Sequence, residues 1–472
     1  MKIIKYLFLT ILSGVVLSSC SDAYDVDPGD EITDENAITN VADLESALTG
    51  VYASIGGRSF IEWSAYFTDE TRKGDLNAGQ GVQVHTWSIN SGNTEAESYY
   101  SGIYGTINRV NTVLGKIDQI SVNGEADVNA RERVRAELLA IRAMCHFDLL
   151  RFFSPAYEAS SLGVPIVDKV IIYEKLPRNT FGEVIAFVKE DLATAYETLS
   201  TLSDNSDVTR LTPVGVQAIR ARVALYNKEY NDAITFANDV INVIPLATPA
   251  NYNDIWLDTE DHVESAFKLR RAVGDAAVGT VFTETDGRVY FNISYDLFDQ
   301  FTSGDVRATA GALYDPASTL NNLIVGKYNN RAGNPQLADI KLYRVAEMYL
   351  IVAEAQVLKP GSDLDAGEAA INTLRASRRT NASALPDLNF TDVTDAINKI
   401  LAERRKELAF EGHRFFDLKR LNRGVDRIPS DVVLNPFAED LPAGDYRFTL
   451  PIPAAAIQYN NNLVPNPNYT SQ

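Results

Sequence analysis

Apolar and polar residues alternate at helical spacing over most of the chain. In residues 41–55, Leu44, Leu48, Val51 and Ile55 fall on one face, which predicts an amphipathic helix. The same spacing predicts further helices at residues 99–117, 130–153, 181–199, 213–228, 230–244, 340–358, 365–377 and 392–421. We therefore expect a mostly α-helical protein.

Small residues mark one pair of neighbouring helices. Ala218 and Ala221 on the first helix, with Ala233 and Ala237 on the second, let two antiparallel helices approach closely. This pattern is typical of the tetratricopeptide repeat, which has about 34 residues per unit. Residues 340–377 repeat it, and we expect three or four such helix pairs in the chain.

Two long segments, residues 59–97 and 258–335, lack a helical period. The first is rich in Gly, Asn, Asp and Thr, and the second alternates Gly and Asp turns with short strand-like runs at residues 265–270 and 288–293. Residues 450–469 also read as irregular. Long loops inside a compact protein are usually functional, so we expect the ligand-binding part of the protein in these two segments.

The first residues have the order of a bacterial lipoprotein signal. Lys2 and Lys5 precede an apolar run at residues 6–17, which is too short to span a bilayer, and small residues then lead directly to Cys20. We expect cleavage of residues 1–19 and acylation of Cys20. Residues 20–31 then form an acidic flexible tether, and residues 32–472 form the folded part.

Composition narrows the possible partners and cofactors. A net charge of −20 argues against nucleic acid as a partner. The remaining cysteine, Cys145, lies in an apolar helical stretch, which predicts a buried, unreactive thiol. The four histidines show no paired spacing with one another or with cysteine. We expect neither a metal site nor a cofactor.

Several motifs resemble one family in their order along the chain. The signature Lys406-Glu407-Leu408-Ala409-Phe410-Glu411-Gly412-His413-Arg414-Phe415-Phe416-Asp417-Leu418-Lys419-Arg420, preceded by Glu403-Arg404-Arg405, resembles that of the SusD/RagB lipoproteins. Further segments that resemble the family lie at residues 142–149, 163–165, 343–349, 353–355, 450–453 and 466–469. The resemblance covers nearly the whole chain.

This resemblance implies a fold and a role. SusD-like proteins have four tetratricopeptide-type helix pairs packed against an irregular, loop-rich ligand-binding part, and they lack catalytic activity. They are lipid-anchored in the outer membrane and face the cell surface. Each forms a lid over a TonB-dependent, SusC-like transporter and captures oligosaccharides or, in the RagB branch, oligopeptides for uptake.

The carboxylates of the signature are interpreted as structural. Glu403, Glu407 and Glu411 recur at four-residue spacing among arginines, which predicts ion pairs on the helix surface and buried structural pairs. A glycosidase needs two carboxylates across a cleft, and one helix face does not provide them. We expect no catalytic residues, although a surface glycan hydrolase and a scaffold that binds only protein are the competing classes.

The candidate ligand residues lie in the irregular segments. Trp87 and Asn90 resemble the Trp-x-x-Asn of the starch-binding founder of the family, and Asp69 resembles its preceding acidic position. Arg72 stands where the founder has an aromatic residue, and Tyr290 is placed on the opposite wall of the site. Core packing is the competing interpretation for Trp87 and Tyr290, and turn formation is the competing interpretation for Asn90 and Asp69.

The ligand class stays open between glycan and peptide. An aromatic ring beside an amide, as in Trp87 and Asn90, favours a glycan. Arg72, together with Lys73, would instead suit an anionic group such as a uronic acid, a sulfate or a peptide carboxylate.

Overall fold

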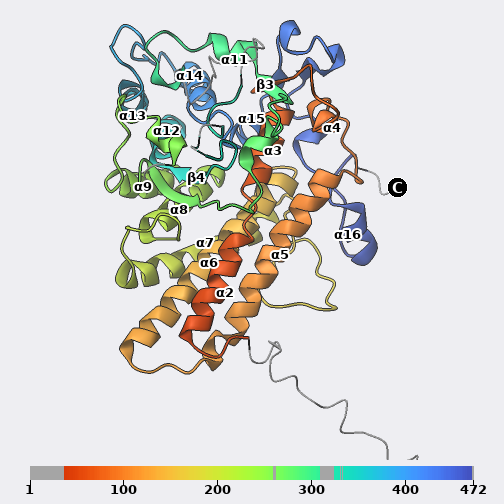
Figure 1. Ribbon diagram of the computed structural model, residues 1–472, viewed down its shortest axis with the longest axis vertical. Coiled ribbons are helices and arrows are strands. Elements are labelled where there is room, and N and C mark those ends of the chain that lie inside the picture. Colours follow the sequence, from red (N-terminus) through yellow and green to blue (C-terminus); the bar gives the residue numbers. More distant parts are fainter. Residues whose placement is uncertain (1–36, 259–261, 309–323, 330, 332, 470–472) are drawn as a thin grey trace, which may run out of the picture.

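The structure is a computed structural model that describes residues 37–258, 262–308, 324–329, 331 and 333–469. The signal segment, Cys20 and the tether therefore lie outside the described residues. Three long helices, α2 (Val41–Ala53), α5 (Thr94–Lys116) and α6 (Glu125–Phe153), pack side by side along the molecule (Figure 1). Within the described ranges, no helix is both long and apolar enough to cross a membrane.

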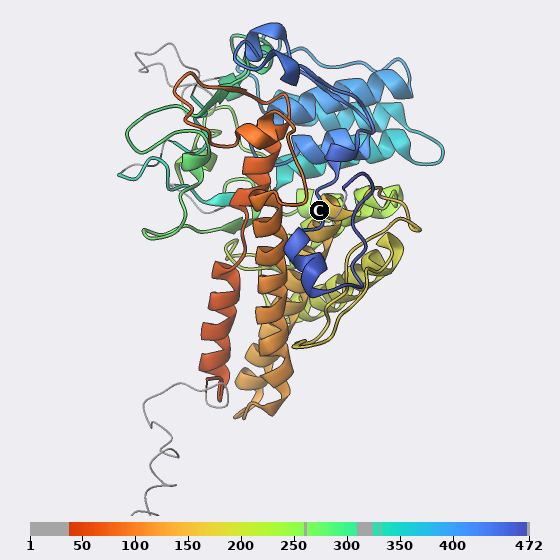
Figure 2. The same cartoon turned by 90° about the vertical axis from the view of Figure 1, so that its right-hand side faces the viewer.

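The remaining long helices form packed pairs. Helix α6 packs against α7 (Phe181–Leu202), α8 (Pro213–Tyr226) against α9 (Tyr230–Ile241), and α12 (Val345–Leu358) against α13 (Leu364–Ala376). Helices α9 and α12 also pack together, so successive pairs are in contact. Figure 2 shows these pairs on one side of the long helices and the loops of the irregular segments on the other.

Alanines let the paired helices approach closely, as the sequence predicts. Ala218 and Ala221 on α8 and Ala233 and Ala237 on α9 are all fully buried. Helix α8 begins with Pro213 after Thr212, whose side chain accepts a hydrogen bond from the Gly215 N–H, an arrangement that satisfies a free amide of the first turn. The assignment of the pairs to four tetratricopeptide units stays a prediction.

The predicted helix at residues 340–358 is wrong at its start. Residues Ile340–Arg344 form strand β4, which pairs antiparallel with β2 (Ser265–Leu269), the strand expected at residues 265–270. Helix α12 begins only at Val345. Its residues are buried on nearly every face, and a helix that is apolar all round lacks the period that would mark its first turn.

The predicted helix at residues 392–421 is interrupted. Helix α14 spans Val393–Glu407 and α15 spans Arg414–Arg420. Between them Phe410 and Gly412 have φ values of 64° and 84°, which no right-handed helix contains. A Cβ at Gly412 would lie 2.8 Å from Phe60, so glycine allows this turn to pack closely against α3.

The segment at residues 59–97 is less irregular than predicted. It contains α3 (Arg58–Phe67), α4 (Val82–His85) and β1 (Thr71–Lys73). Strand β1 pairs antiparallel with β3 (Phe291–Ile293), so the two irregular segments join in one small sheet. The expected strand at residues 288–293 therefore begins later than predicted.

Short elements complete the chain. Strands β5 (Val425–Asp426) and β6 (Asp440–Leu441) pair antiparallel, and η4 (Pro429–Asp431) and η5 (Pro436–Ala438) lie between them in the sequence. The other short helices are α10 (Asp254–Leu257), α11 (Tyr295–Asp299), α16 (Ala454–Tyr459), η1 (Ile117–Gln119), η2 (Val278–Val281), η3 (Val306–Ala308) and η6 (Tyr446–Phe448).

The signature carboxylates form a buried ion network. Glu407 pairs with Arg344 at 3.2 Å, Arg378 at 3.0 Å and Arg307 at 3.2 Å. Burial opposes its charge, but these three arginines outweigh burial and hold the pKa of Glu407 well below its ordinary value. Arg307 also binds Glu403, and Arg344 also binds Glu411. Their predicted role as structural ion pairs is confirmed.

Removing one charge from this network should be costly. Glu407→Gln leaves buried arginines without a full counter-charge, and breaking a buried pair costs about 3–5 kcal/mol. We expect a loss of that size in the free energy of unfolding, measured by urea denaturation. Lys189→Gln is the control, because its pair with Glu229 is exposed and should contribute less than about 1 kcal/mol. Equal costs for the two variants would refute the role of the network.

Candidate functional site

Asp69 lies at the end of α3 in an ion-paired environment. Its two carboxylate oxygens accept hydrogen bonds from Arg414 at 2.8 and 2.7 Å, and Arg405 lies 3.2 Å away. Burial alone would raise the pKa of Asp69, but the charges of Arg405 and Arg414 hold it well below its ordinary value. The Asp69 carboxylate thus links the segment before β1 to α14 and α15. Because arginines occupy both of its oxygens, few acceptor positions remain for a ligand in this conformation.

Trp87 is buried beneath the same region. Its indole N–H donates to the carbonyl of Phe67 at 2.9 Å, and the Arg427 guanidinium lies over its ring at 4.5 Å. Arg427 in turn donates to the carbonyls of Thr68 and His85. One face of the ring is therefore covered by protein, and the assignment of Trp87 to a ligand stays a prediction.

Tyr290 and Asn90 lie in different surroundings. Tyr290 is buried and its hydroxyl donates to Glu284 within the turn that precedes β3. Asn90 is exposed in the turn before α5, and its side-chain oxygen accepts the Gly92 N–H at 2.9 Å. The neighbouring Ser91 carbonyl accepts a hydrogen bond from the first residue of α16, Ala454.

Arg72 lies on β1 opposite Asn292 of β3. Its guanidinium lies 4.3 Å from the ring centre of Tyr295, the first residue of α11. The structure thus gathers Asp69, Arg72 and Tyr290 around the β1–β3 sheet. Tyr295 was missed by sequence reasoning, although its position after Ser294, at a junction between a strand and a helix, is a signal that could have found it.

Exposed apolar side chains follow in the segment that contacts this sheet. Segment η4 packs against both β1 and α11, and the Asp431 carboxylate accepts the Tyr295 N–H at 2.8 Å. Shortly after Asp431, Leu434 and Phe437 are exposed, and Tyr295 itself is 37% exposed. We call Arg72 and Tyr295 the Tyr295 surface, together with Leu434 and Phe437 as the exposed apolar side chains that follow Asp431 in the sequence. Exposed aromatic rings are suited to the apolar faces of sugar rings.

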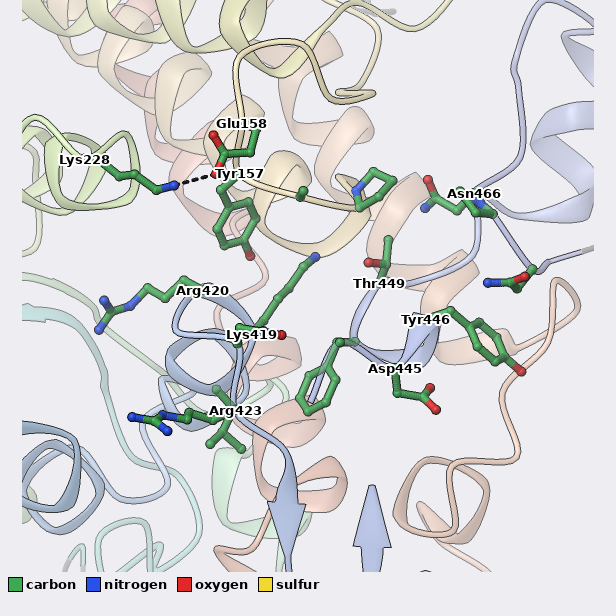
Figure 3. Close-up of a pocket in the computed structure, with 18 residues that line it drawn as sticks. Tyr157, Glu158, Lys228, Lys419, Arg420, Arg423, Asp445, Tyr446, Thr449 and Asn466 are labelled. Carbon is green, nitrogen blue, oxygen red and sulfur yellow. Dashed lines mark hydrogen bonds and ion pairs between the residues drawn. The ribbon is translucent and has the colours of Figure 1, made fainter. Parts of the chain in front are cut away.

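A polar cavity of about 420 Å³ lies elsewhere, between the helix pairs and the C-terminal loops (Figure 3). Lys228 and Glu158 form an ion pair at its edge, and Lys419 lies between its walls. Burial, reinforced by the charge of Arg178, holds the pKa of Lys419 well below its ordinary value. Its ammonium donates to the carbonyls of Arg151 and Ser154, at the end of α6.

The groups available to a ligand in this cavity include hydroxyls, amides and the exposed Arg423. Arg420 is already paired with Glu354 and Asp417. Tyr446, with 38% of its surface exposed, and Thr449 also line the cavity. The cavity is therefore a second candidate place for a hydroxylated ligand.

Glu70 is a buried carboxyl between α3 and the turn that precedes α15. It accepts the Phe410 N–H at 2.9 Å and the Ser64 hydroxyl at 3.1 Å, and no Lys or Arg nitrogen of the described residues lies within ion-pair distance. Burial raises the pKa of Glu70 to about 7, against the opposing effect of the Phe410 hydrogen bond.

Both halves of the chain match family models. Residues 275–469 match the SusD family, and residues 25–225 match a family described as starch-binding and associating with the outer membrane. Two SusD-like proteins of Formosa agariphila are 24% and 26% identical to the chain. These similarities cover 90% and 99% of this chain and 92% and 100% of the relatives.

Solved structures share the fold. A SusD superfamily protein from Bacteroides thetaiotaomicron gives a TM-score of 0.78 at 24% identity, over 91% of this chain and 100% of that one. A SusD-like carbohydrate-binding protein from Bacteroides vulgatus gives 0.75 at 20% identity, over 90% and 98% of the two chains. The chain belongs to the SusD/RagB family, which confirms the predicted resemblance and the mostly α-helical fold.

Glu70 should make stability depend on pH near neutrality. Because the pKa of Glu70 is raised in the folded protein, the protonated carboxyl stabilises the folded state. This stabilisation is complete below the ordinary pKa of 4.5 and is lost as the pH rises through about 7. Glu70→Gln removes this titration and keeps an oxygen for the Phe410 N–H. From pH 5 to pH 8, the free energy of unfolding should fall in the wild type because Glu70 ionises. In Glu70→Gln this fall should be smaller by about 2 kcal/mol.

Urea denaturation at both pH values measures this difference. Glu97→Gln on the exposed face of α5 is the matched control, and it should follow the wild type. A Glu70→Gln profile that is parallel to the wild type would contradict the titration of Glu70 in this range.

Proposed function

We propose that this protein captures oligosaccharides at the cell surface, without catalysis, and delivers them to a SusC-like TonB-dependent transporter for uptake. The observation that carries the proposal is the match of residues 25–225 to a starch-binding family that associates with the outer membrane. The lipoprotein-like order of residues 1–20 supports a lipid anchor at Cys20, with the folded part facing outward.

Oligopeptide capture is the alternative ligand class for the same role. A glycan hydrolase is disfavoured because Glu403 and Glu407 are buried and paired with arginines, and such carboxylates are not placed across an open cleft. A pure protein scaffold is disfavoured by the exposed aromatic side chains of the Tyr295 surface and by the polar cavity of Figure 3.

The Tyr295 surface is our first choice for the ligand site. Sugar recognition needs a few placed polar groups beside apolar or aromatic surface. Arg72 and Tyr295 meet this need at the junction of the two irregular segments, where the sequence predicts the site. Trp87, Asp69 and Tyr290 are buried and already bonded within the protein, and the exposed Asn90 remains a proposed ligand contact.

Matched tyrosine variants distinguish the two candidate places. Tyr295→Ala should weaken oligosaccharide binding about tenfold or more, because truncation of a central aromatic contact costs more than about 1 kcal/mol. Tyr446→Ala, in the cavity of Figure 3, should leave affinity unchanged. Isothermal titration with a panel of oligosaccharides measures both. The reverse result would move the site to the cavity, and release of sugar products during incubation would show a hydrolase instead.

The anchor and the transporter have a separate test. Cys20→Ala should abolish labelling by radioactive fatty acid and reduce oligosaccharide uptake, because a single lost attachment site removes all acyl chains. Deletion of an adjoining gene for a large TonB-dependent transporter should abolish uptake of the same sugar. Ser21→Ala is the matched control for the cysteine variant. Normal uptake after deletion of the transporter gene would refute the partnership.

A further inference from the structure

Arg72 differs from the other buried arginines in having no partner. It is only 9% exposed, yet among the described residues it makes no ion pair and no hydrogen bond, and its Nε is fully shielded from solvent. Every other arginine buried to this extent in the described chain has a carboxylate or main-chain carbonyls. Arg427, for example, has no carboxylate at ion-pair distance but donates to the carbonyls of Phe67 and Ala438.

The neighbours of Arg72 orient its guanidinium, and the nearby Asp431 carboxylate acts on its charge only from beyond ion-pair distance. The half-exposed ring of Tyr295 lies 4.3 Å below the guanidinium carbon, and such stacking fixes the plane of the donor fork. Asp431 lies nearby, but its carboxylate accepts the main-chain N–H groups of Tyr295 and Asp296. Asp296 is itself paired with Arg405. The charge of Arg72 therefore has no counter-ion at contact distance.

A second unpartnered group lies beside it. Asn292 is directly opposite Arg72 in the antiparallel pair, and opposite residues of such a pair point to the same face. Its side chain is fully buried, and neither its amide nitrogen nor its oxygen has a hydrogen-bond partner in the part of the chain that the structure describes. Buried polar groups are nearly always satisfied, so two such groups together point to a bound polar species.

We propose that Arg72 and Asn292 form a subsite for a carboxylate or sulfate group, so that the captured ligand is an acidic oligosaccharide. The inference rests on the proposed function of glycan capture. A guanidinium fork binds two oxygens of such a group at once, and the Asn292 amide supplies a further donor beside it. The Tyr295 ring then lies next to the sugar that carries the anion. Since the whole protein has a net charge of −20, anion binding requires a local site of this kind.

The test uses tetrasaccharides that differ in charge and share one sugar configuration. Isothermal titration compares tetragalacturonate, a sulfated galactose tetrasaccharide and neutral galactotetraose on the full folded protein. The wild type should bind at least one of the anionic ligands about tenfold or more tightly than the neutral one, and the preferred ligand separates carboxylate from sulfate. Arg72→Gln should remove this preference by weakening anionic binding about tenfold or more and neutral binding by a smaller factor, and Arg72→Lys should keep only part of the preference.

Arg288→Gln is the matched control, because it removes the same charge from an exposed arginine in the other irregular segment, shortly before β3. Arg72→Gln should also change the thermal unfolding temperature only slightly, since within the described residues Arg72 has no hydrogen bond or ion pair to lose and gives up only its contact with the Tyr295 ring. Equal affinity for neutral and anionic ligands, unaffected by Arg72→Gln, would overturn the acidic subsite and leave glycan capture standing. Binding of no saccharide, with binding of an acidic peptide, would overturn both.

Discussion

The pairing of Glu407 with arginines from three separate segments is the constraint on which the rest of the structure depends. Arg307, Arg344 and Arg378 come from η3, from the end of β4 and from the turn after α13. Unpaired charges are expensive in a low-dielectric interior, so these segments must meet around the end of α14. The turn that follows then directs Arg414 to Asp69, and thereby connects the helical part to the irregular part.

Much of the helical part could be predicted because its faces differ in polarity. The alanines of α8 and α9 follow from spacing alone, and the spacing of Glu407 among arginines indicates an ion pair, although its actual partners come from distant segments. Helix α3 was missed although it is amphipathic, because it is only ten residues long and leads directly into polar, turn-forming residues. The break before α15 was also hidden, since the left-handed backbone of Phe410 is imposed by packing rather than by its own preference.

The candidate site shows a different limit. Its residue types are visible in the sequence, but their exposure depends on partners from distant parts of the chain. Trp87 resembles a sugar platform until Arg427 covers one face of its ring, and Asp69 resembles a free carboxylate until Arg414 binds it. Arg72 differs from both of these residues. It is notable because its side chain forms no ion pair or hydrogen bond within the described residues, and no local sequence pattern shows this.

The small β1–β3 sheet has an evolutionary consequence. Three residues of each strand join two loops that are far apart in the sequence, while the ion network and the alanine-packed helices lie outside it. Five of the six strand residues are buried, so substitutions with little penalty to folding are expected at exposed positions beside the sheet, such as Tyr295. Proteins descended from one ancestor can therefore change their ligand specificity by substituting a few side chains there, and the helical part of the fold need not change.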